Sequence, residues 1–263
     1  MIDAKLLQAL QGYFDKQQLV QRAIDPAADA FREWYSGQPS TPNIDSVGLY
    51  PRLLSIDMTI PTTPVVITTL MIGLPDPNDV WFMGIVPLGH FHWKTTLEGQ
   101  YYEAKLSINK WDISDLYDEA YPATLPLPTY PLKAHGSAVN TMLYKPWPDT
   151  TISASLIDQL IAGHDWEACK TVAYNSGLKV IADWFNECPE EYASWTPATI
   201  DLANPLVRLI FRIDFDYPVF INIDFDVMGI PPVDSAEKPR RIGYYDYSIL
   251  LDGTINDVNY YFD

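Results

Sequence analysis

The sequence predicts an α+β protein with a mainly antiparallel sheet, and three observations support this fold class. Helical spacing of apolar residues is confined to an N-terminal segment and to a segment near residues 153–195. Alternation of apolar and polar residues, which is typical of half-buried strands, fills much of the remaining chain. Clusters of proline, glycine, asparagine and aspartate separate these alternating runs. Because the helices are segregated from the strands, an alternating βαβ fold does not fit.

An N-terminal helical hairpin is the first expected feature. An amphipathic helix over residues 3–24 is predicted by apolar residues at three-to-four spacing, namely Leu6, Leu7, Leu10, Phe14, Val20 and Ile24. Asp25 can cap a helix and Pro26 suits a first helical position, so together they predict the start of a second helix. We expect that helix to end at Gly37.

An antiparallel meander is expected after about residue 49. Its strands are β-branched and aromatic runs at Leu53–Ile60, Val65–Leu74, Val80–Val86, Gly89–Leu97 and Gln100–Asn109. One hairpin can be placed in register if Glu98 and Gly99 form a two-residue turn. The opposed pairs are then Lys94 with Glu103, Trp93 with Ala104, Phe91 with Leu106, His92 with Lys105, and Thr95 with Tyr102. This register places the attractive charge pair on one face and apolar pairs on the other.

A second helical segment and four more strands are expected later in the chain. Residues 121–149 are rich in proline and indicate an extended connection. In the helical segment, Gly163 should end one helix, Asp165 should open the next, and Asn175–Gly177 should interrupt it. The strands are expected at residues 206–217, 219–229, 242–251 and 255–262.

The length and composition indicate one domain. The chain has 263 residues and 48% hydrophobic content, enough for a sizeable core, so we expect a single domain over residues 1–263. A subdivision into residues 1–131 and 132–263 is the alternative, because each part combines helices with antiparallel strands. No repeat at a fixed period is visible beyond a short Asp-Phe-Asp echo.

The chain is strongly acidic. It has 17 Lys+Arg against 34 Asp+Glu, a formal net charge of −17 at pH 7. A field of this sign repels nucleic acid phosphates and anionic membrane surfaces, and it accelerates the encounter with basic partners. We therefore expect a basic protein partner, no nucleic acid and no membrane. Solubility alone is the simpler explanation of the charge.

A cytoplasmic location is expected from the cysteines and the apolar runs. Cys169 and Cys188 do not form a disulfide framework and are interpreted as small core residues in a reducing compartment. The first residues lack the basic and continuous apolar regions of a secretory signal. No apolar run reaches the roughly 18 residues that a membrane helix requires.

The segment RIDFDYPVFINIDFD, residues 212–226, has the most unusual charge pattern. Its odd positions are apolar, whereas the even positions include Asp214, Asp216, Asp224 and Asp226. A period of two places these carboxylates on one exposed face of neighbouring strands. A solvated face, an acidic face that binds a partner and a divalent-cation site remain open. A flat sheet spreads carboxylates too far apart for a hard cation, which disfavours the last reading.

A turn at Pro218 allows two registers for this segment. A five-residue loop pairs Asp214 directly with Asp224, whereas a three-residue loop pairs Asp224 with Arg212 and Asp214 with Asn222. Opposed like charges destabilise a cross-strand pair and opposite charges stabilise it, by roughly 0.2–1 kcal/mol. The three-residue loop is therefore predicted, because the charge of Arg212 then offsets the repulsion among the aspartates of this face.

A second candidate site is the pair His90 and His92, which lie on the same face of a predicted strand. Two histidines so placed can chelate a transition metal. Gly84, the two histidines and Glu98 resemble part of the first cupin motif, which implies a metal held by two histidines and a glutamate in a small β-barrel. The resemblance covers residues 84–98 only.

The cupin pattern is not completed elsewhere in the chain. Glu98 lies one or two places too far along and falls in the predicted turn. The segment from His135 to Asn140 has the wrong interval for the second motif. Lys105 is expected opposite His92, and a cation there opposes metal binding. We therefore expect a structural histidine pair, with a metal site as the alternative.

Local catalytic signatures are missing from the sequence. It has no Gly-x-Ser-x-Gly elbow, no phosphate-binding glycine loop and no dinucleotide fingerprint. The pair His164 and Asp165 marks a helix start and is interpreted as a cap. Asp112 and Asp115, beside Trp111, form a short acidic turn. An enzyme is therefore the minority reading.

We expect a non-catalytic binding protein without a cofactor, whose acidic, aromatic-bearing surface engages a basic protein partner. An inhibitor or immunity-type protein that neutralises a cationic toxin is one concrete form. The alternatives are a metal-dependent enzyme that uses His90 and His92, and a carbohydrate-binding module. The residues expected to bind the partner are Asp112, Asp115, Asp214, Asp216, Asp224 and Asp226.

Overall fold

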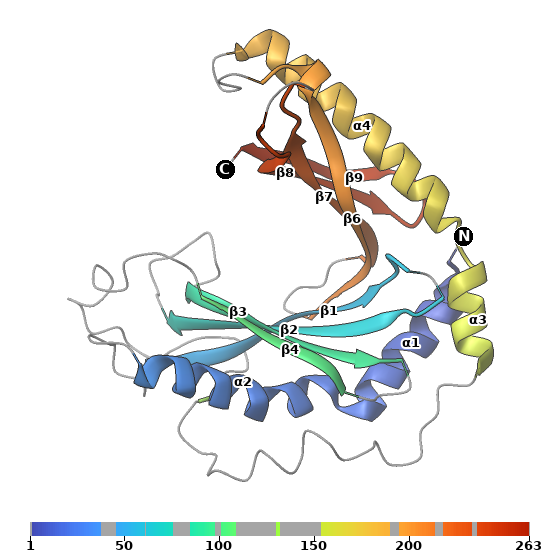
Figure 1. Ribbon diagram of the computed structural model, residues 1–263. Helices are drawn as coiled ribbons and strands as arrows, with labels where there is room; N and C mark the ends of the chain where they lie inside the picture. Colours follow the sequence, from blue (N-terminus) through green and yellow to red (C-terminus); the bar gives the residue numbers. More distant parts are fainter. Residues whose placement is uncertain are drawn as a thin grey trace.

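The protein is seen in a computed structural model as one curved antiparallel sheet with helices on its convex side (Figure 1). The α+β fold class predicted from the sequence is confirmed. The structure describes residues 2–37, 46–60, 62–75, 85–97, 101–108, 130–131, 154–189, 195–213, 218–232 and 236–262.

Eight strands follow one another across the sheet in the order β4-β3-β2-β1-β6-β7-β8-β9, and a short strand, β5, pairs with β1. Every pairing is antiparallel. The strands are β1 (Gly48–Asp57), β2 (Val65–Pro75), β3 (Ile85–Thr96), β4 (Tyr101–Ile108), β5 (Tyr130–Pro131), β6 (Ile200–Arg212), β7 (Phe220–Gly229), β8 (Arg240–Leu250) and β9 (Ile255–Phe262).

The helices are α1 (Ala4–Gln17), α2 (Leu19–Ser36), α3 (Ala154–Ala162) and α4 (Trp166–Glu187), with a 3-10 turn, η6 (Pro197–Thr199), before β6. Helix α2 lies against β1 and β2, and α4 lies against β6, β7 and β8 (Figure 1). Within the described part of the chain, no helix is both long and apolar enough to cross a membrane.

The two parts of the chain repeat the same order of elements, although no repeat at a fixed period is visible in the sequence. In each part, two helices precede four strands that form an antiparallel meander. The innermost strands, β1 and β6, pair at the centre of the sheet, with Leu53 opposite Arg212 and Asp57 opposite Arg208. The sheet is therefore continuous between the two parts.

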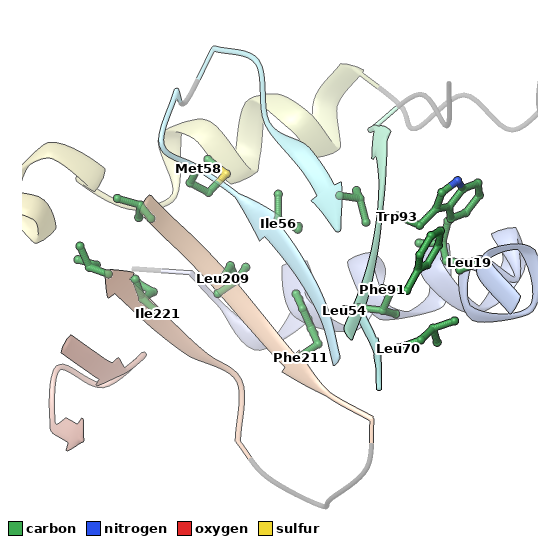
Figure 2. Close-up of a cluster of buried hydrophobic side chains, with 14 of the residues drawn as sticks. Leu19, Leu54, Ile56, Met58, Leu70, Phe91, Trp93, Leu209, Phe211 and Ile221 are labelled. Atoms are coloured by element: carbon green, nitrogen blue, oxygen red, sulfur yellow. The ribbon is translucent and has the colours of Figure 1, made fainter. Parts of the chain in front are cut away.

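One apolar core lies between the sheet and the helices. Alternate strand residues supply its sheet side, so Ile56, Phe91, Leu209 and Ile221 are all buried in the same cluster (Figure 2). Phe14 of α1 packs edge-on against Phe211 of β6, with ring centroids 5.2 Å apart. Full burial of each such side chain contributes about 1.5–3 kcal/mol to stability. The opposite side of the sheet carries the alternate residues, which are mostly polar on β7 and β8 but include a small buried apolar cluster of Tyr50, Met71 and Ile85 at the other end.

Two N-terminal helices are present, but they follow one another around a bend and do not pack together as the predicted hairpin, and the break is not where the sequence placed it (Figure 1). The chain turns at Gln18, which adopts a left-handed conformation with φ of 50°. Pro26 lies inside α2, and Asp25 does not begin a helix. The buried stripe of α2 continues past Pro26 through Ala27, Ala28 and Phe31, so packing against the sheet outweighs the hydrogen bond that proline removes. Gly37 ends α2 as predicted.

Helix α4 is continuous, so the interruption predicted at Asn175–Gly177 is wrong. A Cβ atom on Gly177 would approach side-chain carbons of Leu202 and Tyr245 to 2.5 and 2.8 Å. This glycine therefore allows a close approach between α4 and the sheet and does not end a helix. Asp165 caps α4 as expected, because its Oδ1 accepts a hydrogen bond of 2.9 Å from the backbone N–H of Ala168.

The β3–β4 register predicted from the sequence is confirmed from Gly89 to Lys94, with Lys94 opposite Glu103 and His92 opposite Lys105. Nζ of Lys94 lies 2.8 Å from Oε2 of Glu103. The last predicted pair is wrong, because a register shift after Lys94 puts Thr95 opposite Tyr101. The predicted separate strand Val80–Val86 is also corrected: its last two residues begin β3, and residues 76–84 lie outside the described chain.

Both predicted registers for β6 and β7 are wrong. In the structure Arg208 stands opposite Asn222, and Leu206 stands opposite Asp224. The reason is that β6 begins at Ile200, earlier than predicted, because the Asn204-Pro205 pair is absorbed as a bulge with Asn204 at φ of 51°. The longer strand lets β7 pair over its whole length, whereas the predicted registers would have left the start of β6 unpaired.

Candidate functional site

The middle of the side of β7, β8 and β9 that faces away from the helices is polar, and Phe220 and Leu250 form an apolar row at one end of it. The registers align its residues in three cross-strand rows: Asn222, Ser248 and Asp257; then Asp224, Asp246 and Asn259; then Asp226, Tyr244 and Tyr261. Arg208 of β6 extends the first row. We call these ten residues the polar face. It combines carboxylates, amides and tyrosines within three adjacent strands.

A chain of hydrogen bonds crosses the polar face. Arg208 forms a salt bridge with Oδ2 of Asp224, and Nδ2 of Asn222 donates to Oδ1 of Asp224 at 2.7 Å. Ser248 then donates from its hydroxyl to Oδ1 of Asn222 at 2.7 Å. Arg208 and Asp224 retain only 23% and 25% of their side-chain exposure, so this ion pair is partly desolvated. Such charge-assisted bonds hold the side chains in a defined arrangement.

Asp246 is the most perturbed carboxyl group of the polar face. Burial, together with the negative charge of Asp224 on the neighbouring strand, raises its pKa from 3.8 to about 6. The positive charge of Arg208 acts in the opposite direction. Oδ1 of Asp246 has no hydrogen-bond partner among the described residues. This oxygen is therefore an unsatisfied acceptor.

The third row presents an aromatic pair beside a carboxylate. Tyr244 and Tyr261 stack with ring centroids 4.6 Å apart and an interplanar angle of 21°. Both remain exposed, at 42% and 47%. Asp226 of β7 stands directly opposite Tyr244 of β8. Oδ2 of Asp226 accepts a hydrogen bond of 2.8 Å from Nδ2 of Asn204. Nη1 of Arg241 lies 3.8 Å from Oδ1 of Asp226.

A cavity of about 370 Å³ opens on this side of the sheet. Its polar lining comes from the polar face and the ends of β6 and β9, and its apolar lining comes from Leu53, Ile210 and Phe220. The complete lining is Leu53, Arg208, Ile210, Arg212, Phe220, Asn222, Asp246, Ser248, Asn256 and Asp257. A cavity with charged walls and an apolar side is suited to binding.

The structure brings together two of the carboxylates singled out from the sequence, Asp224 and Asp226. Both belong to β7, and they are partly buried, at 25% and 33% side-chain exposure, where the sequence predicted an exposed face. The remaining predicted residues, Asp112, Asp115, Asp214 and Asp216, lie outside the described chain.

Sequence reasoning missed the six residues of the polar face that lie on β8 and β9. Asp246, Asp257, Tyr244 and Tyr261 lie on β8 and β9, and only the strand pairing joins them to Asp224 and Asp226. Their alternation with Tyr245, Tyr247 and Val258 was a visible signal of one shared face within each strand. It could not place the strands in register.

The histidine pair lies on the same side of the sheet, on β3. The His90 and His92 rings are stacked with centroids 6.4 Å apart, and Oγ1 of Thr69 lies 3.1 Å from Nδ1 of His92. Burial, together with the charges of His90, Arg208, Lys105 and Lys94, lowers the pKa of His92 to about 4. Burial and the charge of Arg52 lower the pKa of His90.

These surroundings favour neutral imidazoles but oppose a dication, because cationic side chains lie on several sides of the pair. Among the described residues, no group of three or more His, Cys, Asp or Glu side chains is arranged to hold a metal ion. Glu98, the third ligand that the cupin resemblance implies, lies outside the described chain.

A cysteine and a histidine meet at the start of α4. Nε2 of His164 lies 2.9 Å from Sγ of Cys169, beside an apolar cavity of about 230 Å³. Burial raises the pKa of Cys169 and lowers the pKa of His164. Both groups are therefore held in their neutral forms, which is the opposite of the thiolate and imidazolium that a cysteine nucleophile requires.

The geometry of the polar face supports binding more than covalent chemistry. Asp224 and Asp226 are engaged with arginine and asparagine, and the one histidine–cysteine pair in the described chain is held neutral. Comparison of the chain with protein-family models, with curated proteins and with solved structures gives no match.

Proposed function

We propose that this is a non-catalytic binding protein whose polar face engages a basic protein partner. The observation that carries the proposal is the third row of that face, where the exposed Tyr244–Tyr261 stack lies beside Asp226. Tyrosines are enriched among the residues that dominate binding energy, because they bury a large area and lose few rotamers.

The charge of the chain supports the same proposal. A formal net charge of −17 attracts a basic partner over long range, and the carboxylates of the polar face would then fix its orientation. Asp257 of β9 is exposed, and Asp226 of β7 keeps 33% of its side-chain exposure. The tyrosines supply the apolar contact area that charge alone does not.

An inhibitor or immunity-type protein that neutralises a cationic toxin is the concrete form that we favour. It would need a rigid acidic surface and no catalytic groups. We place the protein in the cytoplasm, because neither Cys169 nor Cys188 is in a disulfide, as expected of a reducing compartment.

The test begins with affinity purification from the source cells, using the wild-type chain and variants of two surfaces. Asp226→Asn and Tyr261→Ala change the polar face. Asp158→Asn on α3 and Trp184→Ala on α4 make matched changes at exposed positions on the helical side. The dissociation constant of the captured partner is then measured by calorimetry with each variant.

We expect the Kd to rise at least about ten-fold for Tyr261→Ala and several-fold for Asp226→Asn, and to stay unchanged for both controls. For the wild-type chain, the Kd should rise several-fold between about 50 and 150 mM salt. A Kd that does not change in the polar-face variants, or does not change with salt, would contradict the proposal.

A further inference from the structure

The edge strand β9 lacks the features that usually protect the edge of a sheet. Within the described chain, β9 pairs with β8 alone. Edge strands are normally guarded by proline, or by lysine and other charged residues. At the other edge, β4 carries Glu103 and Lys105, whereas β9 has no lysine, arginine or proline and a single charged residue, Asp257. Strand β9 is therefore the edge better suited to pair with another strand.

One hydrogen bond shows which backbone groups of β9 point outward. The N–H of Val258 donates to Oδ1 of Asp257 at 2.9 Å, at an exposed position, so it is not directed at Tyr247, the residue opposite Val258 on β8. In an antiparallel pair, alternate residues of a strand direct their N–H and C=O groups to the same side. Val258 and Tyr260 therefore direct these groups away from β8.

The two faces of β9 have different chemistry. Residues on the helix side are apolar, namely Ile255, Val258 and Tyr260. Residues on the other side belong to the polar face, namely Asp257, Asn259 and Tyr261. Ile255 is 56% exposed and stands opposite Ile249, which lines the apolar cavity of about 230 Å³ beside α4. A strand that pairs with β9 therefore needs apolar residues at alternate positions and polar or basic residues between them.

Charge decides between a second copy of this chain and a different protein as the occupant of this edge. Two copies, each with a formal net charge of −17, repel each other over long range, whereas a basic segment is attracted. Lysine or arginine opposite Asp257 would form an attractive cross-strand pair. An arginine beside Tyr261 can also lie over its exposed ring. The edge therefore matches a basic partner.

We propose that an extended segment of the basic partner adds to β9 as a further antiparallel strand, with basic side chains on the polar face and apolar side chains on the helix side. The inference rests on the proposed function, and it names the way in which the partner is bound. Main-chain hydrogen bonds supply affinity in such strand addition, and the alternating side chains supply specificity. The antiparallel direction is that of the neighbouring pairings in this sheet.

The test uses synthetic peptides instead of the partner. The probe is an eight-residue peptide in which lysine and valine alternate, and a block of lysines followed by a block of valines is the control of the same composition. Two further versions of the alternating peptide carry N-methyl groups on all valines or on all lysines. Binding to the isotope-labelled protein is followed by NMR, through the backbone amide shifts and the hydrogen exchange of β9.

The outward direction of the Val258 amide fixes the expected result. Valines on the helix side lie directly opposite Val258 and Tyr260, so the valine amides point at β9 and the lysine amides point away from it. The unmethylated and lysine-methylated peptides should give saturable shifts and slower exchange at β9. The valine-methylated and block peptides should bind at least about ten-fold more weakly. Equal binding of the two methylated peptides, or shifts centred on another surface, would overturn the inference.

Variants of the protein test the same edge. Val258→Pro removes the outward N–H at a position where an edge strand tolerates proline, and it should weaken the alternating peptide at least about ten-fold. Should this variant disturb the fold, Asp257→Lys reverses the exposed charge and should weaken the peptide several-fold. Asp158→Lys, at an exposed position on α3, is the matched control and should leave binding unchanged.

Sedimentation of the wild-type chain tests the other occupant. We expect a monomer. A dimer that dissociates in Val258→Pro or Asp257→Lys would show that a second copy pairs with β9, and it would overturn the inference.

The two proposals fail in distinguishable ways. If the partner loses affinity on Tyr261→Ala but the alternating peptide does not bind at β9, the binding face is correct and strand addition is wrong. If the peptide adds to β9 but the Kd of the partner does not change in the polar-face variants, the edge site stands and the proposed function is wrong.

Discussion

Asp246 stands directly opposite Asp224 on the neighbouring strand, so two carboxylates share one row of the sheet. Only Asp224 is neutralised by an arginine, Arg208. The pair is a like-charge contact of the kind that destabilises a sheet unless a proton or a cation intervenes. Its consequences can be measured without knowing the partner.

Removal of the Asp246 charge should change the pH dependence of stability. The groups that face Asp246 are Asp224, Asp257 and Arg208. The folded state raises the pKa of Asp246 from 3.8 to about 6, so it binds the proton more tightly than the unfolded chain does. The resulting stabilisation is complete below about pH 4 and is lost as the pH rises through about 6.

Asp246→Asn should therefore be more stable than wild type at pH 8, by on the order of 2 kcal/mol, with the difference shrinking towards pH 4. Urea unfolding at several pH values measures this difference, and taking the difference cancels most of the contribution of the other carboxylates. Parallel stability curves for the two proteins would show that Asp246 titrates normally.

Two glycines in helices should respond to alanine in opposite directions. Gly177→Ala would put a Cβ atom at 2.5 Å from Leu202 and 2.8 Å from Tyr245, so we expect a loss of about 1–3 kcal/mol of stability. Gly12→Ala in α1 meets no atom within 4 Å, so its gain in helix propensity should stabilise by about 0.5–1 kcal/mol. Chemical denaturation measures both changes. Stabilisation by Gly177→Ala would mean that α4 is not closely packed on the sheet.

The histidine pair should behave as a structural element. Because burial and the surrounding cations lower the pKa of His92 to about 4, NMR should show this ring still neutral near pH 5. Its contribution to stability is present above the unfolded pKa, about 6.5, and is lost as the pH falls through about 4. Lys105→Gln removes one of the cations and should raise the pKa of His92.

Metal titration provides the complementary measurement for this pair. We expect added Zn²⁺ to bind no more tightly to the wild-type chain than to His92→Ala. Tight binding that disappears in His92→Ala, or a His92 titration midpoint near 6.5, would favour the metal-enzyme alternative.

Local patterns in the sequence predicted the features that depend on neighbouring residues. The period of two identified the strands, and an assumed turn at Glu98 and Gly99 predicted the β3–β4 register correctly from Gly89 to Lys94. Asp165 was identified as a helix cap because its hydrogen bond is formed within one turn. In each case the partners lie close together along the chain.

Features that depend on distant partners were beyond the sequence. Gly177 looked like a helix break, and only the approach of Tyr245 explains its role. Asn204-Pro205 looked like the boundary of a strand, whereas in the sheet it is a bulge within β6. The position of Arg208 beside Asp224, and not of Arg212, follows from that longer strand.

The sequence by itself determined the fold class, the face on which each strand residue lies and the excess of negative charge. Only the tertiary structure decided which carboxylates face one another. The register between β7, β8 and β9 pairs residues whose local sequence does not indicate their partners. Alternation assigns a side chain to a face, but its neighbours on that face are chosen by hydrogen bonding and packing over the whole sheet.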